Sequence, residues 1–304
     1  MCLIVFDWRP EASDGPLFTL AANRDEFLKR TAEPMHWWDD APGLLAGRDL
    51  VGGGTWLGMT RDGRFAALTN YRAPREMRAD APTRGTLVSN WLSGDHGIES
   101  GAPLDYLLRV AQDGDMYNGF NLLVGDWTRR ELAWYCNRSP SAPTLLAPGT
   151  HGISNAVLDT PWPKLVRKRA ELAKAITDEA RPPLATLIGL MRDPHVARDD
   201  ELPATGISLE RERALSAAFI DTPDYGTRGT TAVQVFAQNG HLSVAALERS
   251  DDNGSHRVAR PGHYERSLRS ISPEGETAAH FHSIPNEARN AAAASACAMA
   301  TSGT

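Results

Sequence analysis

Four pairs of extended apolar segments, each joined by a short polar turn, constrain the fold of this chain more than any other feature. The pairs are 2–6 with 17–22, 55–60 with 64–71, 118–127 with 131–137, and 230–237 with 241–250. Glycines such as Gly63 and Gly240 lie in the turns, and apolar runs around such turns are typical of β-hairpins. Hairpins pair their strands in opposite directions, so the sequence predicts a mostly antiparallel sheet.

Helical periodicity appears between the hairpins. Apolar residues recur at spacings of three and four in segments 103–112, 161–180, 184–193 and 209–219. Three of these segments form a block between the third and fourth hairpins. Strands, then helices, then a final hairpin indicate an α+β domain in which helices cover a mostly antiparallel sheet.

The composition changes after Ser250, where large apolar residues become sparse and alanine becomes frequent. A segment of this kind buries too little surface to offset the entropy lost on ordering. We therefore expect a single domain over residues 1–250 and a largely disordered, Ala-rich tail over residues 251–304.

Charge and cysteine content exclude several function classes. The net charge is −6, which disfavours nonspecific binding to nucleic acid or to an anionic membrane. No apolar run reaches the roughly 18 residues of a membrane span, and no signal-peptide pattern is found. We expect a cytoplasmic protein. The three cysteines form no C-x-x-C pair and the nine histidines are scattered, so we predict no metal site and no required cofactor.

Cys2 is the first candidate for chemistry. Initiator Met is commonly removed when the second residue is small, and the mature chain would then begin with a thiol and a free α-amine on one residue. The α-amine titrates near pH 8 and can take the proton of its own thiol, as an N-terminal nucleophile requires. The alternative is that Cys2 is a small apolar residue that opens a buried strand.

Four polar residues, Asn23, Arg24, Asp25 and Glu26, abruptly end the second apolar segment. They form either a hairpin exit, the start of a helix capped by Asp25, or part of a binding site. A helix start does not explain Arg24, because the helix dipole disfavours a cation there. If this segment pairs with the segment of Cys2, Asp25 could hold the α-ammonium group while Arg24 faces a substrate carboxylate or the thiolate. Asn23 and Glu26 are then candidates for substrate contacts.

Other candidate residues lie in loops and at strand ends. Asn70 and Asn155 carry amide groups that could donate hydrogen bonds to an oxyanion, although asparagine is also an ordinary turn residue. Arg228 precedes the last apolar pair, either as a surface cation or as an anchor for an anionic group. Trp56 and Trp162 offer flat apolar surfaces to a ligand, or belong to the core.

The order of these motifs resembles the NRDE family, also called the transport and Golgi organisation 2 family. The matching segments are MCLIVF, AANRDEF, GRDLVGGGTWLGMT, GRFAALTNYR, NGFNLLVGD, PGTHGISNAVLDTPWPK and YGTRGTT, which together span about residues 1–250. The resemblance implies the αββα sandwich of N-terminal nucleophile hydrolases. It further implies Cys2 as the nucleophile, Asp25 as the carboxylate that holds its amine, Asn155 as an oxyanion-hole residue and Arg228 as a late arginine of the site. Those hydrolases usually carry an arginine where this chain has Ala22.

Two functions follow from this resemblance. The first is a Cys-dependent hydrolase that cleaves a C–N amide or thioester bond in an acylated small molecule. The alternative is a non-catalytic carrier or chaperone that binds haem or acyl-coenzyme A in the same cleft, with Trp56 and Trp162 against the ligand.

Overall fold

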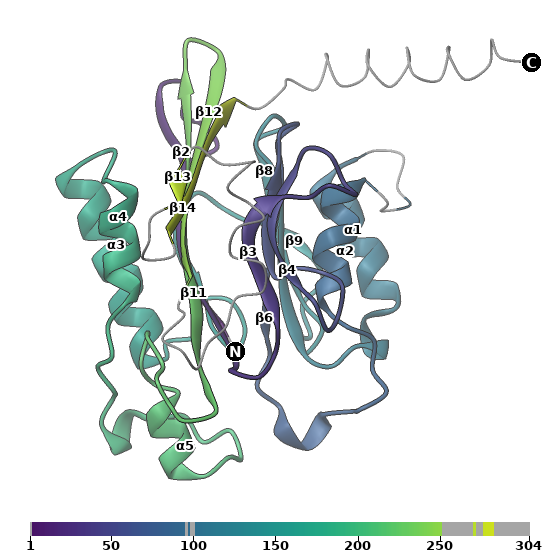
Figure 1. The fold of residues 1–304 in the computed structure, drawn as a ribbon, viewed down its shortest axis with the longest axis vertical. Helices are drawn as coiled ribbons and strands as arrows, with labels where there is room; N and C mark the ends of the chain where they lie inside the picture. The colour runs from purple at the N-terminus through teal and green to yellow at the C-terminus, as the bar shows by residue number, and fades with distance from the viewer. Residues whose placement is uncertain (1, 95–96, 98–100, 251–269, 272–275, 283–304) are drawn as a thin grey trace, which may run out of the picture.

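Two sheets packed face to face, each covered on its outer side by helices, make up the fold (Figure 1). The computed structural model describes residues 2–94, 97, 101–250, 270–271 and 276–282. Within these residues each sheet has seven strands, and every pairing is antiparallel. The layer order is helix, sheet, sheet, helix, so the predicted α+β class and αββα sandwich are confirmed.

The first sheet carries Cys2, the segment 23–26 and Arg228, which are candidate residues from both ends of the domain. Its order is β10-β1-β2-β11-β12-β14-β13. The strands are β1 (Cys2–Trp8), β2 (Gly15–Phe27), β10 (Gly149–Ile153), β11 (Tyr225–Gln238), β12 (His241–Ser250), β13 (Ser270–Ile271) and β14 (Glu276–His282). Strand β1 therefore lies inside the sheet, between β10 and β2.

The second sheet follows the chain order β3-β4-β5-β6-β7-β8-β9. Its strands are β3 (Ala32–Trp37), β4 (Leu44–Asp49), β5 (Leu57–Thr60), β6 (Arg64–Asn70), β7 (Phe120–Asp126), β8 (Glu131–Cys136) and β9 (Thr144–Leu145). Each strand pairs with the next one along the chain, so short turns suffice to build this layer.

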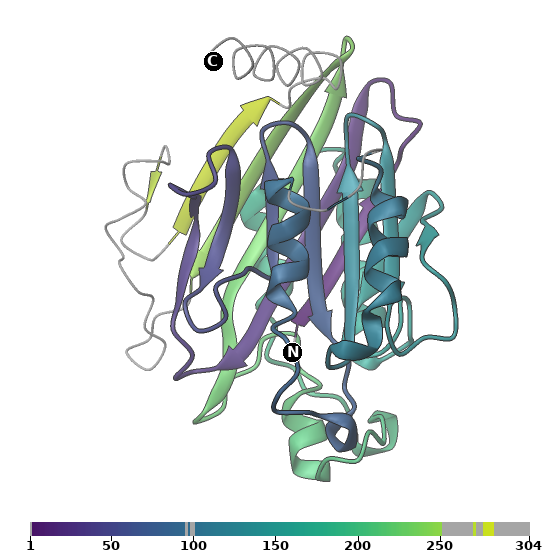
Figure 2. The same ribbon diagram turned by 90° about the vertical axis from the view of Figure 1, so that its right-hand side faces the viewer.

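The helices divide between the two outer faces. They are α1 (Gly85–Ser93), α2 (Pro103–Gln112), α3 (Pro163–Asp178), α4 (Leu184–Met191) and α5 (Leu209–Ala214), with the 3₁₀ turns η1 (Pro74–Glu76), η2 (Gly114–Met116) and η3 (Asp199–Glu201). Helices α1 and α2 cover the second sheet, as Figure 2 shows from that side. Helices α3 and α4 cover the first sheet. No helix within the described ranges is long and apolar enough to cross a membrane.

An aromatic core holds the two sheets together. Phe6 and Phe18 of the first sheet contact each other with ring centroids 5.9 Å apart. Phe18 meets Phe65 of the second sheet at 5.2 Å, and Phe65 meets Trp127 at 5.1 Å. All four side chains are at most 1% exposed. The space between the sheets is therefore filled at this level, and a pocket lies farther along it, where the lining side chains become polar.

All four predicted hairpins are confirmed by the pairings β1–β2, β5–β6, β7–β8 and β11–β12. The helical segments are confirmed as α2, α3, α4 and α5, the last of which ends at Ala214, earlier than expected. Helix α1 and strands β3, β4 and β10 were not predicted. The expected disorder of residues 251–304 falls largely outside the described residues; within that range β13 and β14 extend the first sheet.

The aromatic core gives a direct test of the sandwich. Phe18→Ala removes a side chain that contacts rings of both sheets, and we expect the free energy of unfolding to fall by about 3–5 kcal/mol. Urea denaturation followed by circular dichroism measures this. Val166→Ala, at a position 44% exposed, is the matched control and should stay close to the parent protein. A loss below about 1 kcal/mol for Phe18→Ala would contradict the packing.

Candidate active site

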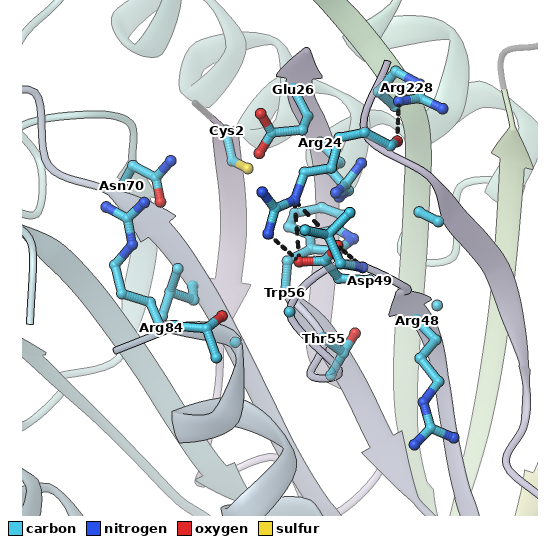
Figure 3. A pocket seen from close by; sticks show the side chains of 18 of the residues that line it. Cys2, Arg24, Glu26, Arg48, Asp49, Thr55, Trp56, Asn70, Arg84 and Arg228 are labelled. Carbon is cyan, nitrogen blue, oxygen red and sulfur yellow. Dashed lines mark hydrogen bonds and ion pairs between the residues drawn. The ribbon is translucent and has the colours of Figure 1, made fainter. Parts of the chain in front are cut away.

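Cys2 lies at the polar end of the space between the sheets. It pairs in register with Arg24 across β1 and β2. Side chains alternate along a strand, so Cys2 is on the same face as Ile4 and Phe6, which belong to the core between the sheets. Cys2 is 7% exposed, and Figure 3 shows its sulfur beside a pocket of about 560 Å³. This volume falls within the range of small-molecule sites.

The pocket collects residues from distant parts of the chain. Its walls come from the ends of β2, β4, β6, β11 and β12, from the loop around residues 51–56, and from residues 78–85 before and at the start of α1. Gly54 lets that loop pack on α1, because a side chain there would collide with the backbone of Gly85. The site therefore depends on contacts between both sheets and one helix.

Asp25 adjoins Cys2 from the neighbouring strand and is 1% exposed. The Thr227 hydroxyl donates a 2.7 Å hydrogen bond to its Oδ1, and the Tyr225 hydroxyl donates to its backbone oxygen at 2.7 Å. Burial raises the pKa of the Asp25 carboxyl, while the Lys164 charge and the Thr227 hydrogen bond act against this rise. Asp25 is thus held in one orientation by two residues of β11.

The Cys2 thiol is tuned by the same surroundings. Burial raises the pKa of this thiol, and the Asp25 carboxylate adds to the rise. The backbone N–H of Asp25 and the Arg24 charge stabilise the thiolate and therefore act against this rise in pKa. A buried thiol of this kind needs a nearby base to take its proton before it can attack a carbonyl group.

Lys164 is the residue that the sequence analysis missed. It is the second residue of α3, is 1% exposed, and donates from Nζ to the Leu215 carbonyl at 2.9 Å. Burial lowers its pKa to about 8, and the Asp25 carboxylate acts against this lowering. A cation in the first turn of a helix opposes the helix dipole, and this is the signal in the sequence that could have identified it.

Five further candidate residues line the pocket together with Cys2 and Asp25. They are Arg24, Glu26, Trp56, Asn70 and Arg228. Arg228 is 8% exposed, so the surface-cation interpretation is wrong. Its Nη1 donates to the carbonyl oxygens of Phe27 at 3.1 Å and Arg30 at 2.8 Å, which fixes the turn after β2. The alternative of a helix start at Asp25 is also wrong, because β2 continues to Phe27.

Asn155 lies behind Asn70 and does not line the pocket. It is 1% exposed and donates from Nδ2 to the backbone oxygen of Asn70 at 2.9 Å. Its own backbone oxygen accepts a 2.7 Å bond from Arg72. Asn155 therefore fixes the backbone of Asn70. Of these two asparagines, Asn70 is the one that lines the pocket.

Asn23 and Trp162 lie away from the pocket. Asn23 is on the helix-covered face of β2, where its amide donates at 2.8 Å to the carbonyl oxygens of Met191 and Ala218. Trp162 precedes α3 and packs against the Arg72 guanidinium, 4.7 Å from the ring centroid. Both residues therefore contact segments outside the pocket, Asn23 at Met191 and Ala218 and Trp162 at Arg72.

Comparison with known proteins agrees with this arrangement of motifs. The sequence profile of the family described as Transport and Golgi organisation 2 matches residues 1–251. This chain belongs to that family. The bovine Transport and Golgi organization protein 2 homolog is 37% identical over 265 residues, covering 82% of this chain and 93% of the relative. The human homolog is 35% identical over 285 residues, covering 89% of this chain and all of the relative.

Among solved structures, the chain is similar to the Caenorhabditis elegans N-acylethanolamine-hydrolyzing acid amidase ortholog. The TM-score is 0.37 at 7% identity, covering 76% of this chain and 92% of that structure.

In the part of the chain that the structure describes, no group of three or more His, Cys, Asp or Glu side chains is placed to hold a metal ion.

The burial of Lys164 in this family member predicts a pH-dependent stability. Its folded pKa of about 8 lies below the unfolded value of 10.5, so the unfolded chain binds more protons between these values. Wild type should therefore gain stability relative to Lys164→Met as pH rises from 8 to 10.5, by up to about 3 kcal/mol. The neighbouring charges of Asp25, Cys2, Arg72 and Glu212 are common to both proteins.

Chemical denaturation at pH 7.5, 9 and 10 measures this difference. Lys174→Met, on the same helix but with a side chain 74% exposed, is the control and should show a much flatter dependence. A stability difference between wild type and Lys164→Met that does not change with pH would show that Lys164 titrates normally.

Proposed function

We propose that this protein is a Cys-dependent hydrolase of a C–N amide or thioester bond in an acylated small molecule. The observation that carries the proposal is the position of Cys2 on the wall of a pocket of about 560 Å³, with a buried carboxylate next to it. Met1 is removed in this proposal, so that Cys2 supplies both the nucleophilic sulfur and the base.

The reaction proceeds in two stages. The α-amine of Cys2 takes the thiol proton, and the thiolate attacks the substrate carbonyl carbon to give a tetrahedral intermediate. The ammonium group returns the proton to the leaving amine or thiol as the C–N or C–S bond breaks. A water molecule, deprotonated by the same amine, then attacks the thioester on Cys2 and releases a carboxylic acid and the free thiol.

Asp25 and Lys164 act behind the nucleophile. The Asp25 carboxylate accepts hydrogen bonds from the α-ammonium group and orients it toward the sulfur. Thr227 fixes this carboxylate, and the Lys164 charge favours its ionised form. We therefore propose Asp25 and Lys164 as positioning residues.

Asn70 is the proposed oxyanion donor. It lies at the end of β6 and lines the pocket opposite the start of β1. Its backbone is held by the Asn155 amide, so Asn155 contributes to the oxyanion site through Asn70. The position of Asn155 outside the pocket lining supports this division of roles.

The N-terminus of the mature protein provides the first test. Intact mass spectrometry of protein purified from its native host should show that Met1 is absent. Cys2→Ala should then lower turnover of acyl-amide and acyl-thioester substrates by roughly 10³-fold or more. Cys136→Ala, at the second buried cysteine of the described residues, is the matched control and should retain activity. Retention of Met1 in the native protein would contradict the mechanism.

A second candidate function is a non-catalytic carrier for haem or acyl-coenzyme A. Trp56 and Arg24 on the pocket wall support it, because they suit a ligand with a flat or apolar part and an anionic group. A carrier needs no free α-amine. It would bind its ligand equally well with Met1 retained.

Ligand titration separates the two functions. For a haem carrier, wild type and Cys2→Ala should both give a saturable Soret change at micromolar haem, with little difference between them. Trp56→Ala should weaken the response, and Trp38→Ala, in the core beneath α1 and α2, controls for general destabilisation. No saturable change in wild type would count against haem, and the same comparison with an acyl-coenzyme A tests the other ligand.

A further inference from the structure

We propose that Arg24 and Arg84 form an anion-binding subsite beside Cys2, so that the molecule accepted there carries a carboxylate or phosphate group close to its acyl carbonyl. The inference rests on the proposed function in one respect, which is that the reacting carbonyl lies at Cys2. It adds the chemical class of the substrate and a binding residue, Arg84, that no motif indicated.

Most cations of this pocket already have partners. Arg30 forms an ion pair with Asp49 at 2.6 Å, and its guanidinium is held by both carboxylate oxygens. Arg48 pairs with Asp40 at 2.7 Å through two parallel hydrogen bonds. Arg228 donates to two backbone carbonyl oxygens. Carboxylates therefore balance the charges of Arg30 and Arg48, and the Nη1 group of Arg228 is occupied by the backbone of the pocket wall.

Arg24 and Arg84 differ from the others. Like Arg78, they form no ion pair with a carboxylate of the described residues, but Arg78 and Arg228 each donate to two backbone carbonyl oxygens, and Arg24 and Arg84 have fewer acceptors. Among the described residues, the Arg84 guanidinium makes one hydrogen bond, from Nη1 to the Gly119 carbonyl at 2.9 Å, and burial lowers its pKa from the ordinary value. Burial of a guanidinium is unfavourable, and the Glu26 charge offsets only part of this cost, since the Arg84 pKa stays lowered. An anion bound to the remaining N–H groups would offset more of it.

The two arginines lie on opposite sides of Cys2. Arg24 is its cross-strand partner, and Arg84 immediately precedes α1, whose first turn contains no acidic residue. Figure 3 shows Asn70 and Arg84 on one side of the Cys2 sulfur, with Arg24 and Glu26 on the other. The Cys2 and Glu26 charges both act on Arg84. An anion between the guanidinium groups would therefore hold a substrate carbonyl within reach of the sulfur.

The acidic residues around the pocket are engaged elsewhere. Glu26 accepts a hydrogen bond from the Phe27 backbone N–H at 2.8 Å. Glu248 accepts from the Met35 N–H at 2.6 Å and from the Thr231 hydroxyl at 3.1 Å. Asp25 is held by Thr227. Each of these carboxylates has hydrogen-bond donors that orient it. The Glu26 charge also acts on Arg84, and the Arg24 charge acts on Glu248 and Asp25. No ion pair forms between these groups in the described residues, so N–H groups of both arginines remain available to a ligand.

The subsite can be tested without knowing the substrate, through alkylation of Cys2. In this reaction the Cys2 thiolate displaces iodide from iodoacetate, which is anionic, or from iodoacetamide, which is neutral. Thiol pKa and burial affect both rates alike, so the ratio of the two rates reports attraction of the anion. Peptide mass spectrometry resolves Cys2 from the other cysteines. Alkylation of Cys136, which is 0% exposed, reveals any unfolded protein.

We expect the iodoacetate-to-iodoacetamide ratio to fall by about three- to tenfold in both Arg84→Gln and Arg24→Gln, as loss of a nearby unit charge implies. Arg84→Lys should keep most of the wild-type ratio. Arg48→Gln, which removes a cation already paired with Asp40, is the matched control and should leave the ratio unchanged. Equal ratios in wild type, Arg24→Gln and Arg84→Gln would overturn the proposal.

Competition then distinguishes the two anion classes. Inorganic phosphate and glutarate are added separately at constant ionic strength, and the one that slows carboxymethylation of Cys2 at lower concentration identifies the preferred group. If neither anion slows the reaction in wild type, the proposal is also overturned. Because alkylation requires no turnover, a protein without hydrolase activity could still show the subsite, and the two proposals fail separately.

Discussion

The register between β1 and β2 determines where every group of the proposed site stands. Cys2 is opposite Arg24, so the thiol, the Arg24 guanidinium and the Glu26 carboxylate share the face that looks into the space between the sheets. A shift by one residue would either turn Cys2 toward α3 and α4, or keep Cys2 in place and exchange Arg24 for Asn23 in the pocket. The buried aromatic side chains farther along both strands resist such a shift, since they would move out of the core.

The space between the two sheets serves two purposes along its length. At one level it is filled by Phe6, Phe18 and Phe65, which bury large apolar surfaces and fix the distance between the sheets. Closer to the start of β1 the same faces carry charged side chains, which cannot pack as tightly and leave the pocket. The rigid aromatic part thereby supports the precision of the polar part, as a binding site requires.

Local patterns accounted for most of the fold. The hairpins were predicted because strand and turn are neighbours in the sequence, so their signals do not depend on the rest of the chain. Helix α1 was missed because it begins after Arg84 with no side-chain cap, and its first residue is Gly85. Strand β3 was missed because Pro34 interrupts its alternation, and its pairing with β4 is irregular at the same place.

The site was predictable to the extent that it lies on β1 and β2. The polar residues after Ala22 identified Arg24 and Asp25, and strand alternation explains why Asn23 faces the helices. Lys164 and Arg84 reach the same region from α3 and from the start of α1, and only the tertiary packing brings them there. Asn155 illustrates the same limit, because its amide is directed to the Asn70 backbone by a contact between a loop and the end of β6, which are distant in the sequence.

Strand β14 determines which edge of the first sheet is open to pairing with another chain. It pairs with β12 from Ser243 to Arg249, along the edge that β12 would otherwise present to solvent. An open strand edge is a template for pairing with another chain. The family profile matches residues 1–251, so β14, which pairs with the edge of β12, lies beyond the segment that this profile matches. Within the described residues, this pairing moves the edge open to another chain from β12 to β14, along which β13 pairs only at Thr277 and Ala278.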